Sequence, residues 1–466
     1  MTVEAQVGES EEALEWVETA FTDRQDDYEK YQDYYDGRHK VELTDRLREF
    51  LKVSEKAFNA NFCEPVVDAM TDRLAVVSFD TDEEDAEDAP LAAWAQDAWA
   101  ANRMDGQQRV AHEQAAIKGD AYVLCEWDAR RERVRLAVNA PDLIRPRYDP
   151  ADRDRTLWTA KRWGLTKPDR QQLNLYFPDR IEKYQRGAAG ARWEQRQDAE
   201  GEPWPIPWTG ADGEPLGIPV VHLRNKPGVG SFGRSELQNI VPLQNVLNKT
   251  LVDLIMVLDT LGFQQRWLVN AQRPSGGFKI YPGVVWNVAP LNPDAAVQLG
   301  QFPSESPEGL IAALREIVEE IAGVSRTPTH MLRLGPSFPS GEALQTAEQG
   351  LVSKVRSRQV VLGNAWEDVM ALARAVAVSI GGQAEIPEGA FSAVWADPET
   401  RNELAHVQTI GTKVGVLGVP QVQAWREVGY SPSDIERMLA DKRDEKVGDA
   451  NLGAAILRGF SSGAEE

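Results

Sequence analysis

Residues 341–380 read GEALQTAEQGLVSKVRSRQVVLGNAWEDVMALARAVAVSI, and their pattern predicts one helix of about forty residues. An apolar stripe at three- and four-residue spacing consists of Leu344, Ala347, Leu351 and Val355. Helices in globular proteins average about 11–12 residues, whereas this one would be roughly 60 Å long. Such a helix is typical of an elongated subunit that packs beside copies of itself. Because glycine weakens a helix locally, we expect a kink near Gly350 or Gly363.

The sequence before this helix predicts two further helices, separated by a short β segment and followed by a loop. We expect the first helix at 235–261, the β segment at 264–288, the second helix at 307–322 and the loop at 326–340. Ser235 and Gln238 have the spacing of a capping box, and Pro307 suits the first turn of a helix. Within the β segment, alternation at 266–269 and 278–281 predicts two short strands.

The first of these helices is markedly apolar between residues 251 and 259. A membrane span needs about 18–20 apolar residues with few or no charges, and Lys249, Asp253 and Asp259 interrupt this run. We therefore expect the helix to be buried between subunits, and a membrane pore is the alternative.

The composition of the chain limits its class. The 466 residues suffice for two or three domains, and the net charge of −22 argues against a protein that coats nucleic acid. Cys63 and Cys125 lie far apart without metal-ligand spacing, which fits buried thiols in a reducing cytosol. We expect neither a secretory signal nor a transmembrane helix.

The first half of the chain predicts an α+β domain, because helical patterns come first and strand patterns follow. Helices are expected at 11–38, from residue 61 to 74, at 90–103 and at 107–118. Strands are expected at 76–79, 121–127, 134–139, 157–165, 173–177, 181–185 and 219–223. Residues 80–88 carry seven acidic side chains and predict a solvated loop, since the glycine and terminal glutamate of a calcium-binding EF-hand loop are missing.

After the long helix the chain predicts a strand that returns to the first domain, and then a small helical part. The strand is expected at 391–395, a helix at 398–414, a helical unit at 419–446 and a polar tail at 448–466.

The glycine-rich loop at 228–235, GVGSFGRS, matches G-x-G-x-x-G and comes close to the phosphate-binding pattern G-x-x-x-x-G-K-[ST]. Arg234 stands where that pattern has lysine, and no parallel βαβ repeat surrounds the loop. We favour a hinge that leads into the first long helix. A nucleotide-binding enzyme that uses this loop is the alternative.

No other catalytic or metal-binding pattern stands out. His39, His112, His222, His330 and His406 do not pair at metal-ligand spacing with another His or Cys. We expect no G-x-S-x-G nucleophile elbow, and H-E-x-x-H does not occur. We expect no catalytic residue, no metal and no cofactor.

The loop at 326–340 is long for a connection between helices, which usually takes 2–8 residues. Three prolines stiffen it, and it carries Arg326, His330 and Arg333. Such a loop is suited to project into a channel and contact a polyanion. An ordinary helix–helix connection is the alternative.

Several stretches, taken in order, resemble the portal proteins of tailed bacteriophages, especially the type common in phages of Gram-positive hosts. They are residues 61–68 (NFCEPVVD), 72–76 (DRLAV), 233–237 (GRSEL), 243–249 (LQNVLNK), 340–344 (SGEAL) and 366–370 (WEDVM). Each motif is weak by itself, whereas the ordered set is fairly specific and covers most of the chain.

The resemblance implies an α+β subunit that is elongated, with an α/β wing, a two-helix stem, a small β-containing clip, a long kinked helix and a small helical crown. The implied bounds are 1–234 for the wing, 235–261 and 304–325 for the stem, 262–303 for the clip, 326–340 for a tunnel loop, 341–418 for the long helix with the rest of the wing, and 419–466 for the crown and tail.

The resemblance further implies a ring, usually of twelve subunits, at one capsid vertex, with a channel for DNA packaging and ejection. The implied DNA-facing residues of the tunnel loop are Arg326, His330, Arg333 and Ser337. The implied partner-facing residues of the clip are Arg266, Arg273 and Lys279. One departure is that the helix at 307–322 is mostly acidic, with Arg315 as its only base, whereas portal stems often present basic residues to the channel.

The partners implied are terminase, the head–tail connector, and the major capsid and scaffold proteins, with no membrane. ATP hydrolysis would belong to the terminase, and the protein would be assembled in the host cytoplasm and end in the virion. A wall of strongly acidic subunits would repel DNA phosphate and limit sticking, which suits a conduit.

Overall fold

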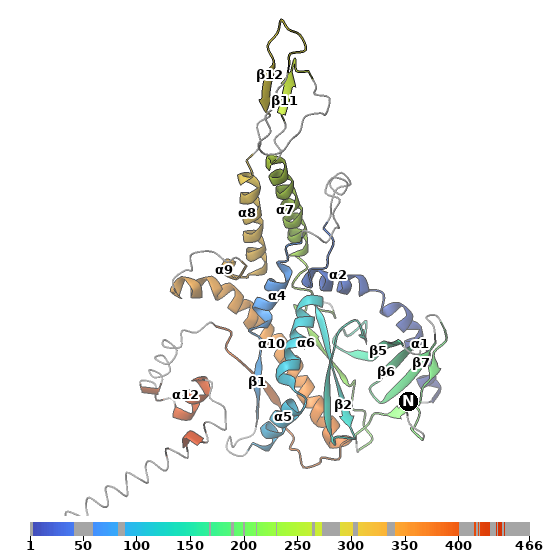
Figure 1. Ribbon diagram of the computed structural model, residues 1–466. Coiled ribbons are helices and arrows are strands. Elements are labelled where there is room, and N and C mark those ends of the chain that lie inside the picture. The colour runs from blue at the N-terminus through green and yellow to red at the C-terminus, as the bar shows by residue number, and fades with distance from the viewer. Residues whose placement is uncertain are drawn as a thin grey trace, which may run out of the picture. The chain divides into compact units, whose positions relative to one another are not determined.

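The computed structural model (Figure 1) describes residues 3–41, 59–82, 89–166, 169–187, 191–198, 201–210, 212–229, 231–262, 266–272, 289–301, 306–332, 341–399, 414–415, 418, 420–428, 435, 437–439 and 442. Its helices are α1 (Val3–Ala20), α2 (Gln25–Tyr35), α4 (Cys63–Thr71), α5 (Pro90–Ala101), α6 (Met104–Lys118), α7 (Val241–Gly262), α8 (Glu308–Ser325), α9 (Thr329–Leu332), α10 (Gly341–Ser379) and α12 (Gln421–Val428). Its strands are β1 (Val76–Thr81), β2 (Asp120–Asp128), β3 (Arg133–Asn139), β4 (Ile144–Tyr148), β5 (Thr156–Thr166), β6 (Asp169–Tyr176), β7 (Arg180–Arg186), β8 (Glu194–Gln195), β9 (Ile206–Pro207), β10 (Val220–Arg224), β11 (Arg266–Val269), β12 (Gln298–Gln301) and β13 (Phe391–Trp395). This mixture of helices and antiparallel sheets confirms the α+β class.

The chain divides into two compact units. One comprises residues 1–338 and 346–398, and the other comprises residues 339–345 and 399–466. In the second unit the structure describes α12, with Ala424 and Ile435 buried. The helix expected at 398–414 and the rest of the expected helical unit lie largely outside the described residues.

A three-stranded antiparallel sheet, in the order β10–β2–β3, carries the main core of the first unit. Helix α6 packs on β2, and Cys125 Sγ of β2 lies 3.8 Å from the carbonyl oxygen of Val369 in α10. Trp366 of α10 is fully buried, and its indole N–H donates to His112 of α6 at 2.9 Å. The apolar stripe that predicted the long helix therefore continues into the centre of the core.

The strand predicted after the long helix is confirmed as β13. It pairs antiparallel with β1, from Val76 opposite Trp395 to Thr81 opposite Phe391. Because β1 precedes α5 and β13 follows α10, this small sheet joins two distant parts of the sequence.

A second antiparallel sheet, in the order β4–β5–β6–β7–β8 with β9 beside β7, packs against α1. Figure 1 shows α1 and α2 as separate helices, so the single helix predicted at 11–38 was wrong. Phe21 is buried in the core under this sheet, whereas Arg24 reaches Asp120 of the other sheet at 3.4 Å. The helix is interrupted between Phe21 and Arg24 because the two side chains contact different sheets. Strand β4 was not predicted, and it contains Pro146, which weakens a strand pattern.

Helices α7 and α8 pack side by side and project away from the sheets, with the β11–β12 hairpin beyond their far ends (Figure 1). The start predicted for α7 at residue 235 was wrong, since residues 236–240 form turns and the helix begins at Val241. Ser235 Oγ accepts from Leu237 N at 3.0 Å and donates to the carbonyl of Ile117, so it caps a turn against α6. Pro242 is then the second helical residue, where its missing N–H costs nothing.

Among the described residues, α7 is long and apolar enough over Val241–Leu258 to cross a membrane by length and composition alone, a test that core helices of soluble proteins also pass. Only 28% of this window is buried. Val246 and Leu258 are among its exposed apolar residues.

Helix α10 runs through Gly350 and Gly363 without interruption, and the predicted kink stays a prediction. A Cβ atom at Gly363 would lie 3.2 Å from the indole nitrogen of Trp395, whereas one at Gly350 would make only an ordinary contact with Arg326. The predicted strand 266–269 is confirmed as β11, and its partner is β12 at 298–301. The partner predicted at 278–281 lies outside the described residues, as do residues 83–88 of the acidic run.

Candidate functional site

Residues 233–235, at the end of the glycine-rich loop, pack against the C-terminal end of α6. Gly233 N donates to Asp120 Oδ1 at 2.7 Å, and Arg234 N donates to the carbonyl of Asn225 at 2.7 Å. A Cβ atom at Gly233 would lie 2.0 Å from the carbonyl oxygen of Gly119, so the close approach of two backbones requires glycine here. A phosphate-binding loop presents its amides to the ligand, but these two amides are already bonded within the protein. The geometry gives the nucleotide-binding alternative no support.

Asp120 is fully buried and binds groups from several elements. Tyr28 Oη of α2 donates to it at 2.7 Å, and His222 Nε2 of β10 lies 2.9 Å away. Burial by itself would raise the pKa of Asp120, but the hydrogen bond from His222 and the charge of Arg24 outweigh burial and lower this pKa. Because the Asp120 carboxylate is inaccessible to solvent, it cannot bind a substrate. Its hydrogen bonds instead join α2, β2 and β10.

Glu236 is the centre of an ionic cluster where the segment before α7 meets α10. Its side chain is 2% exposed, and its carboxylate lies 2.7 Å from Lys226 Nζ, 3.0 Å from Lys354 Nζ and 3.0 Å from the Arg358 guanidinium. Burial would raise the pKa of Glu236, but these three cations lower it to about 2. The carboxylate therefore stays ionised at every physiological pH.

The same cluster fixes the end of α8. Lys354 Nζ also donates to the carbonyl of Ser325 at 3.1 Å, which places a cation at the negative end of that helix. Arg326 follows as the C-cap, in the left-handed conformation with φ of 56°, and its N–H donates to the Gly323 carbonyl at 3.2 Å. Residue 326, where the predicted loop begins, is thus held firmly at its backbone.

A cavity of about 370 Å³ lies beside the Glu236 cluster. Besides that cluster, Arg234, Asn239, Ser357 and Arg326 line it. Arg234 and Arg326 are exposed, and no carboxylate of the described residues is paired with either guanidinium. The structure therefore places the predicted residue Arg326 on the wall of a basic cavity.

His330 belongs to a different contact. The residues expected to form an irregular loop at 326–340 include the short helix α9, so the loop prediction was wrong for Thr329–Leu332. His330 Nε2 lies 3.4 Å from Glu348 Oε1 of α10, and Glu348 also binds Arg73 at 3.0 Å. Arg333 and Ser337, the other predicted loop residues, lie outside the described residues.

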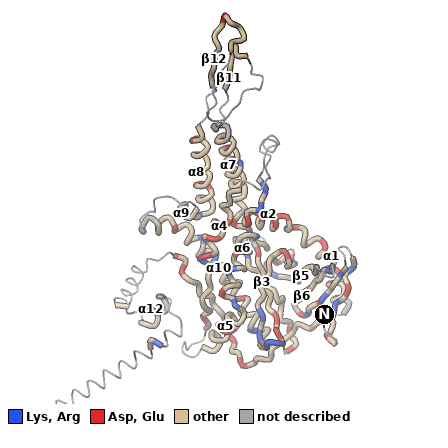
Figure 2. The backbone as a smooth tube through the Cα atoms, in the orientation of Figure 1, with Lys and Arg blue, Asp and Glu red and all other residues tan. Residues whose placement is uncertain are grey.

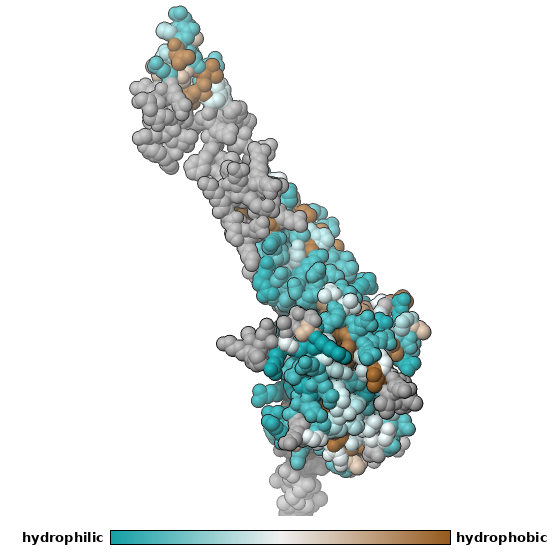
Figure 3. Space-filling view, turned by 90° about the vertical axis from the view of Figure 1, so that its right-hand side faces the viewer, coloured by the Kyte–Doolittle hydropathy of each residue, from teal (hydrophilic) through white to brown (hydrophobic). Residues whose placement is uncertain are grey.

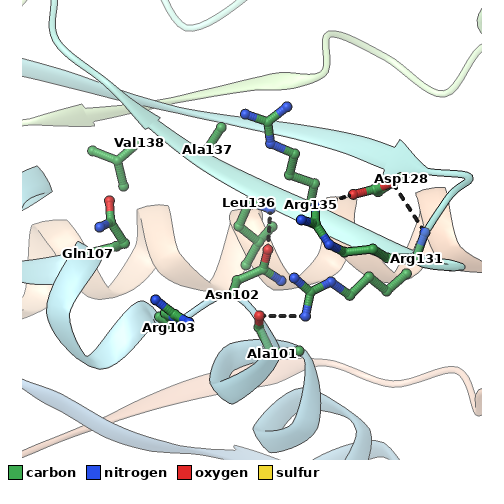
Figure 4. A pocket seen from close by; sticks show the side chains of 11 residues that line it. Ala101, Asn102, Arg103, Gln107, Asp128, Arg131, Arg135, Leu136, Ala137 and Val138 are labelled. Atoms are coloured by element: carbon green, nitrogen blue, oxygen red, sulfur yellow. Dashed lines mark hydrogen bonds and ion pairs between the residues drawn. The ribbon is translucent and has the colours of Figure 1, made fainter.

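A second basic cavity, of about 600 Å³, lies between the α5–α6 turn and the β2–β3 hairpin (Figure 4). Figure 2 shows basic residues, drawn in blue, on this hairpin. Arg131 pairs with Asp128 at 2.9 Å, and Arg133 donates to the last carbonyl of α5 at 2.6 Å. Arg131 and Arg135 are 67% and 61% exposed, so solvent screens their charges, unlike those around Glu236.

The β11–β12 hairpin exposes apolar side chains, which Figure 3 shows in brown at the top of the view. Trp267, Val269, Leu291 and Leu299 are exposed apolar residues of this region. Of the predicted partner-facing residues, Arg266 opens β11, and nothing is described of its side chain. Arg273 and Lys279 lie outside the described residues.

Sequence reasoning did not identify Glu236, Lys354 or Arg358 as a group. Glu236 belongs to the GRSEL stretch, whereas its two partners lie on α10 more than 100 residues later. The available signal was the position of both cations one turn apart, at i and i+4, within a helix that is otherwise apolar on one face.

Comparison with known proteins gives a consistent result. The family described as "Phage portal protein, SPP1 Gp6-like" matches residues 14–447. The chain is 24% identical to a portal protein of Mycobacterium phage D29, over 94% of this chain and 90% of that protein. It is equally 24% identical, with the same coverage of both chains, to a portal protein of Mycobacterium phage L5.

Proposed function

Since this chain belongs to the SPP1 Gp6-like family of phage portal proteins, we propose that it forms a ring of twelve subunits through which double-stranded DNA enters and leaves the capsid. The family match over residues 14–447 carries this proposal. Portal proteins are structural components of the virion capsid, and they work as ring oligomers in association with capsid and terminase. The nucleotide-binding alternative receives no support from the family or from the geometry of residues 228–235.

The proposed division of the subunit follows the elements of the structure. Residues 1–234 with β13 would form the wing, α7 and α8 the stem, residues 262–303 the clip, residues 326–340 the tunnel loop, and the region of α12 the crown. The projecting pair α7 and α8 supports the stem assignment, because both helices join the main core only at one end (Figure 1).

Neighbouring stems would cover the apolar side chains that α7 and α8 leave exposed. Val246 on α7 is 52% exposed in the single chain, and Val110 on α6 is 45% exposed. Val246→Asp should prevent ring assembly, since it would place a charge in an interface between copies. Val110→Asp is the matched control and should form rings. Size-exclusion chromatography with light scattering would measure both, and rings from Val246→Asp at the usual yield would exclude this interface.

The proposed contact with DNA lies at the tunnel loop and uses Arg326, together with His330, Arg333 and Ser337. Arg326 supports it best among the described residues, because its exposed guanidinium follows a firmly held backbone. The double variant Arg326→Ala and Arg333→Ala should assemble rings but package or retain less DNA. Normal packaging in an in vitro assay would refute this role.

The clip would dock the terminase and later the head–tail connector, and the wing would meet the major capsid and scaffold proteins. Exposed apolar residues on the β11–β12 hairpin support a docking role, and Arg266, Arg273 and Lys279 are the proposed polar contacts. Leu299→Ser should weaken binding to purified terminase without preventing ring formation. An unchanged affinity would remove the hairpin from the docking surface.

Electron microscopy of the purified protein tests the proposal as a whole. Class averages viewed along the ring axis should show about twelve subunits around a central hole, the number usual in portals. Monomers or dimers, both alone and with scaffold protein present, would overturn the proposed ring.

A further inference from the structure

The Glu236 cluster contains more positive than negative charge. Lys226, Lys354 and Arg358 surround one carboxylate, and the side chains of Lys354 and Arg358 are only 5% and 10% exposed. A buried charge is costly unless an opposite charge compensates it. Glu236 can compensate one of these three cations, which leaves a surplus of positive charge beside the cavity.

The cavity concentrates this surplus further. Arg234 and Arg326 add two guanidinium groups to its walls, and Asn239 and Ser357 add an amide and a hydroxyl. These donors come from the segment before α7, the end of α8 and α10, so they surround the space from several sides. Its volume of about 370 Å³ is ample for a small tetrahedral anion.

We propose that this cavity is a binding site for a phosphate-type oxyanion. The planar fork of arginine suits the paired oxygens of phosphate, and lysine adds a point charge for the same ligand. The negative groups at the cavity do not prevent this binding. Three cations surround the single carboxylate of Glu236, and Lys354 Nζ donates to the Ser325 carbonyl at the end of α8. The donors are side chains, so this site differs from the backbone cradle that the motif at 228–235 suggested.

An anion in this cavity would connect the segment before α7, the start of the tunnel loop and α10. Two sources share the required chemistry, namely free phosphate and the backbone of double-stranded DNA. The second source rests on the proposed function, because DNA reaches the cavity only if the tunnel loop lines a channel. Binding of free phosphate does not depend on it.

The first experiment measures phosphate binding to the full chain by calorimetry, at constant ionic strength with chloride as the reference anion. Arg234→Gln with Arg326→Gln should bind phosphate at least about tenfold more weakly, since each lost hydrogen bond to a charged group contributes roughly that factor. The control pair is Arg103→Gln with Arg135→Gln, which removes the same charge from the cavity in Figure 4 and should leave the affinity unchanged. Both altered pairs are on the surface, so the variants should fold.

Equal losses in the two pairs would show general charge attraction and overturn the proposal, as would a wild-type chain that does not distinguish phosphate from chloride.

The same titration on assembled rings, with and without a short DNA duplex, identifies the source. Competition by the duplex would assign the site to the DNA backbone, and undisturbed phosphate binding would assign it to the free ion. Phosphate binding by monomers but not by rings would mean that a second copy fills the cavity, and would overturn the proposal. Intact rings that bind no phosphate would refute this site while the proposed ring stands.

Discussion

Replacing Glu236 by Gln removes the carboxylate at the centre of a cluster of three cations and should strongly destabilise the fold. The pKa of Glu236 is about 2, against an ordinary value of 4.5. At 1.36 kcal/mol per pKa unit, this difference corresponds to about 3 kcal/mol of folding stability. The loss of one partner from a buried ion pair typically costs about 3–5 kcal/mol, which is the same range.

The assay is urea unfolding followed by tryptophan fluorescence, at pH 7 and at lower pH. The pKa of Glu236 is lowered in the folded state, so its contribution is complete above pH 4.5 and is lost as the pH falls towards about 2. The difference between wild type and Glu236→Gln should therefore be largest at pH 7 and shrink in acid.

Glu126→Gln is the control, because that carboxylate is 34% exposed and lies 4.0 Å from its arginine, so its loss should change the stability by less than about 1 kcal/mol. In the Glu236→Gln background, Lys354→Met should restore part of the stability, since it removes a buried cation that has lost its partner. The reasoning would be refuted if Glu236→Gln were as stable at pH 7 as Glu126→Gln.

Three other predictions concern single sites. Burial lowers the pKa of His112 from 6.5 to about 4, so between these pH values only the unfolded state binds the proton. The free energy of unfolding should therefore fall by about 3 kcal/mol as the pH drops across that range. Plotted against pH, it should have a steeper slope in wild type than in His112→Phe, and identical slopes would contradict the prediction. Gly233→Ala should lower the free energy of unfolding by more than about 3 kcal/mol or prevent folding, because its Cβ atom would collide with the Gly119 carbonyl. A circular dichroism spectrum and melting temperature like those of wild type would contradict this prediction. Gly350→Ala should raise the free energy of unfolding by about 1 kcal/mol, because alanine favours the helix. Gly363→Ala should gain less, because its methyl group would lie close to the Trp395 indole. A higher melting temperature for Gly363→Ala than for Gly350→Ala would contradict this prediction.

Local patterns were sufficient to predict the elements that depend on periodicity. The apolar pattern of residues 341–380 located α10 to within one residue at its C-terminus, and alternation located β11. The returning strand expected at 391–395 is β13. The start of α7 was misplaced because Ser235 and Gln238 have the spacing of a capping box, while the Ser235 hydroxyl is bonded to α6 instead. Tertiary contacts decided that position, and they are not visible in a local pattern.

The candidate site was less predictable than the fold. Arg326 was identified from the charge and length of its loop, but its place on the wall of a basic cavity depends on Lys354 and Arg358 of α10. The match to a nucleotide-binding pattern at 228–235 was misleading for a related reason. Glycine is needed at Gly233 because Gly119 approaches it, and that approach joins residues more than 100 positions apart.

The pairing of β1 with β13 has a consequence for how the chain is made. Thr81 leaves the ribosome long before Phe391, its partner in the ladder, and at 5–20 residues per second the interval is roughly 15–60 s. During that time the core also lacks Trp366, which fills the space beside His112 and Trp99. A truncated chain that ends before residue 391 therefore cannot form the small sheet, and one that ends before residue 366 also lacks the side chain that fills the main core. Translation through residue 395 thus becomes a condition for a competent subunit, which would keep shorter chains out of the proposed ring.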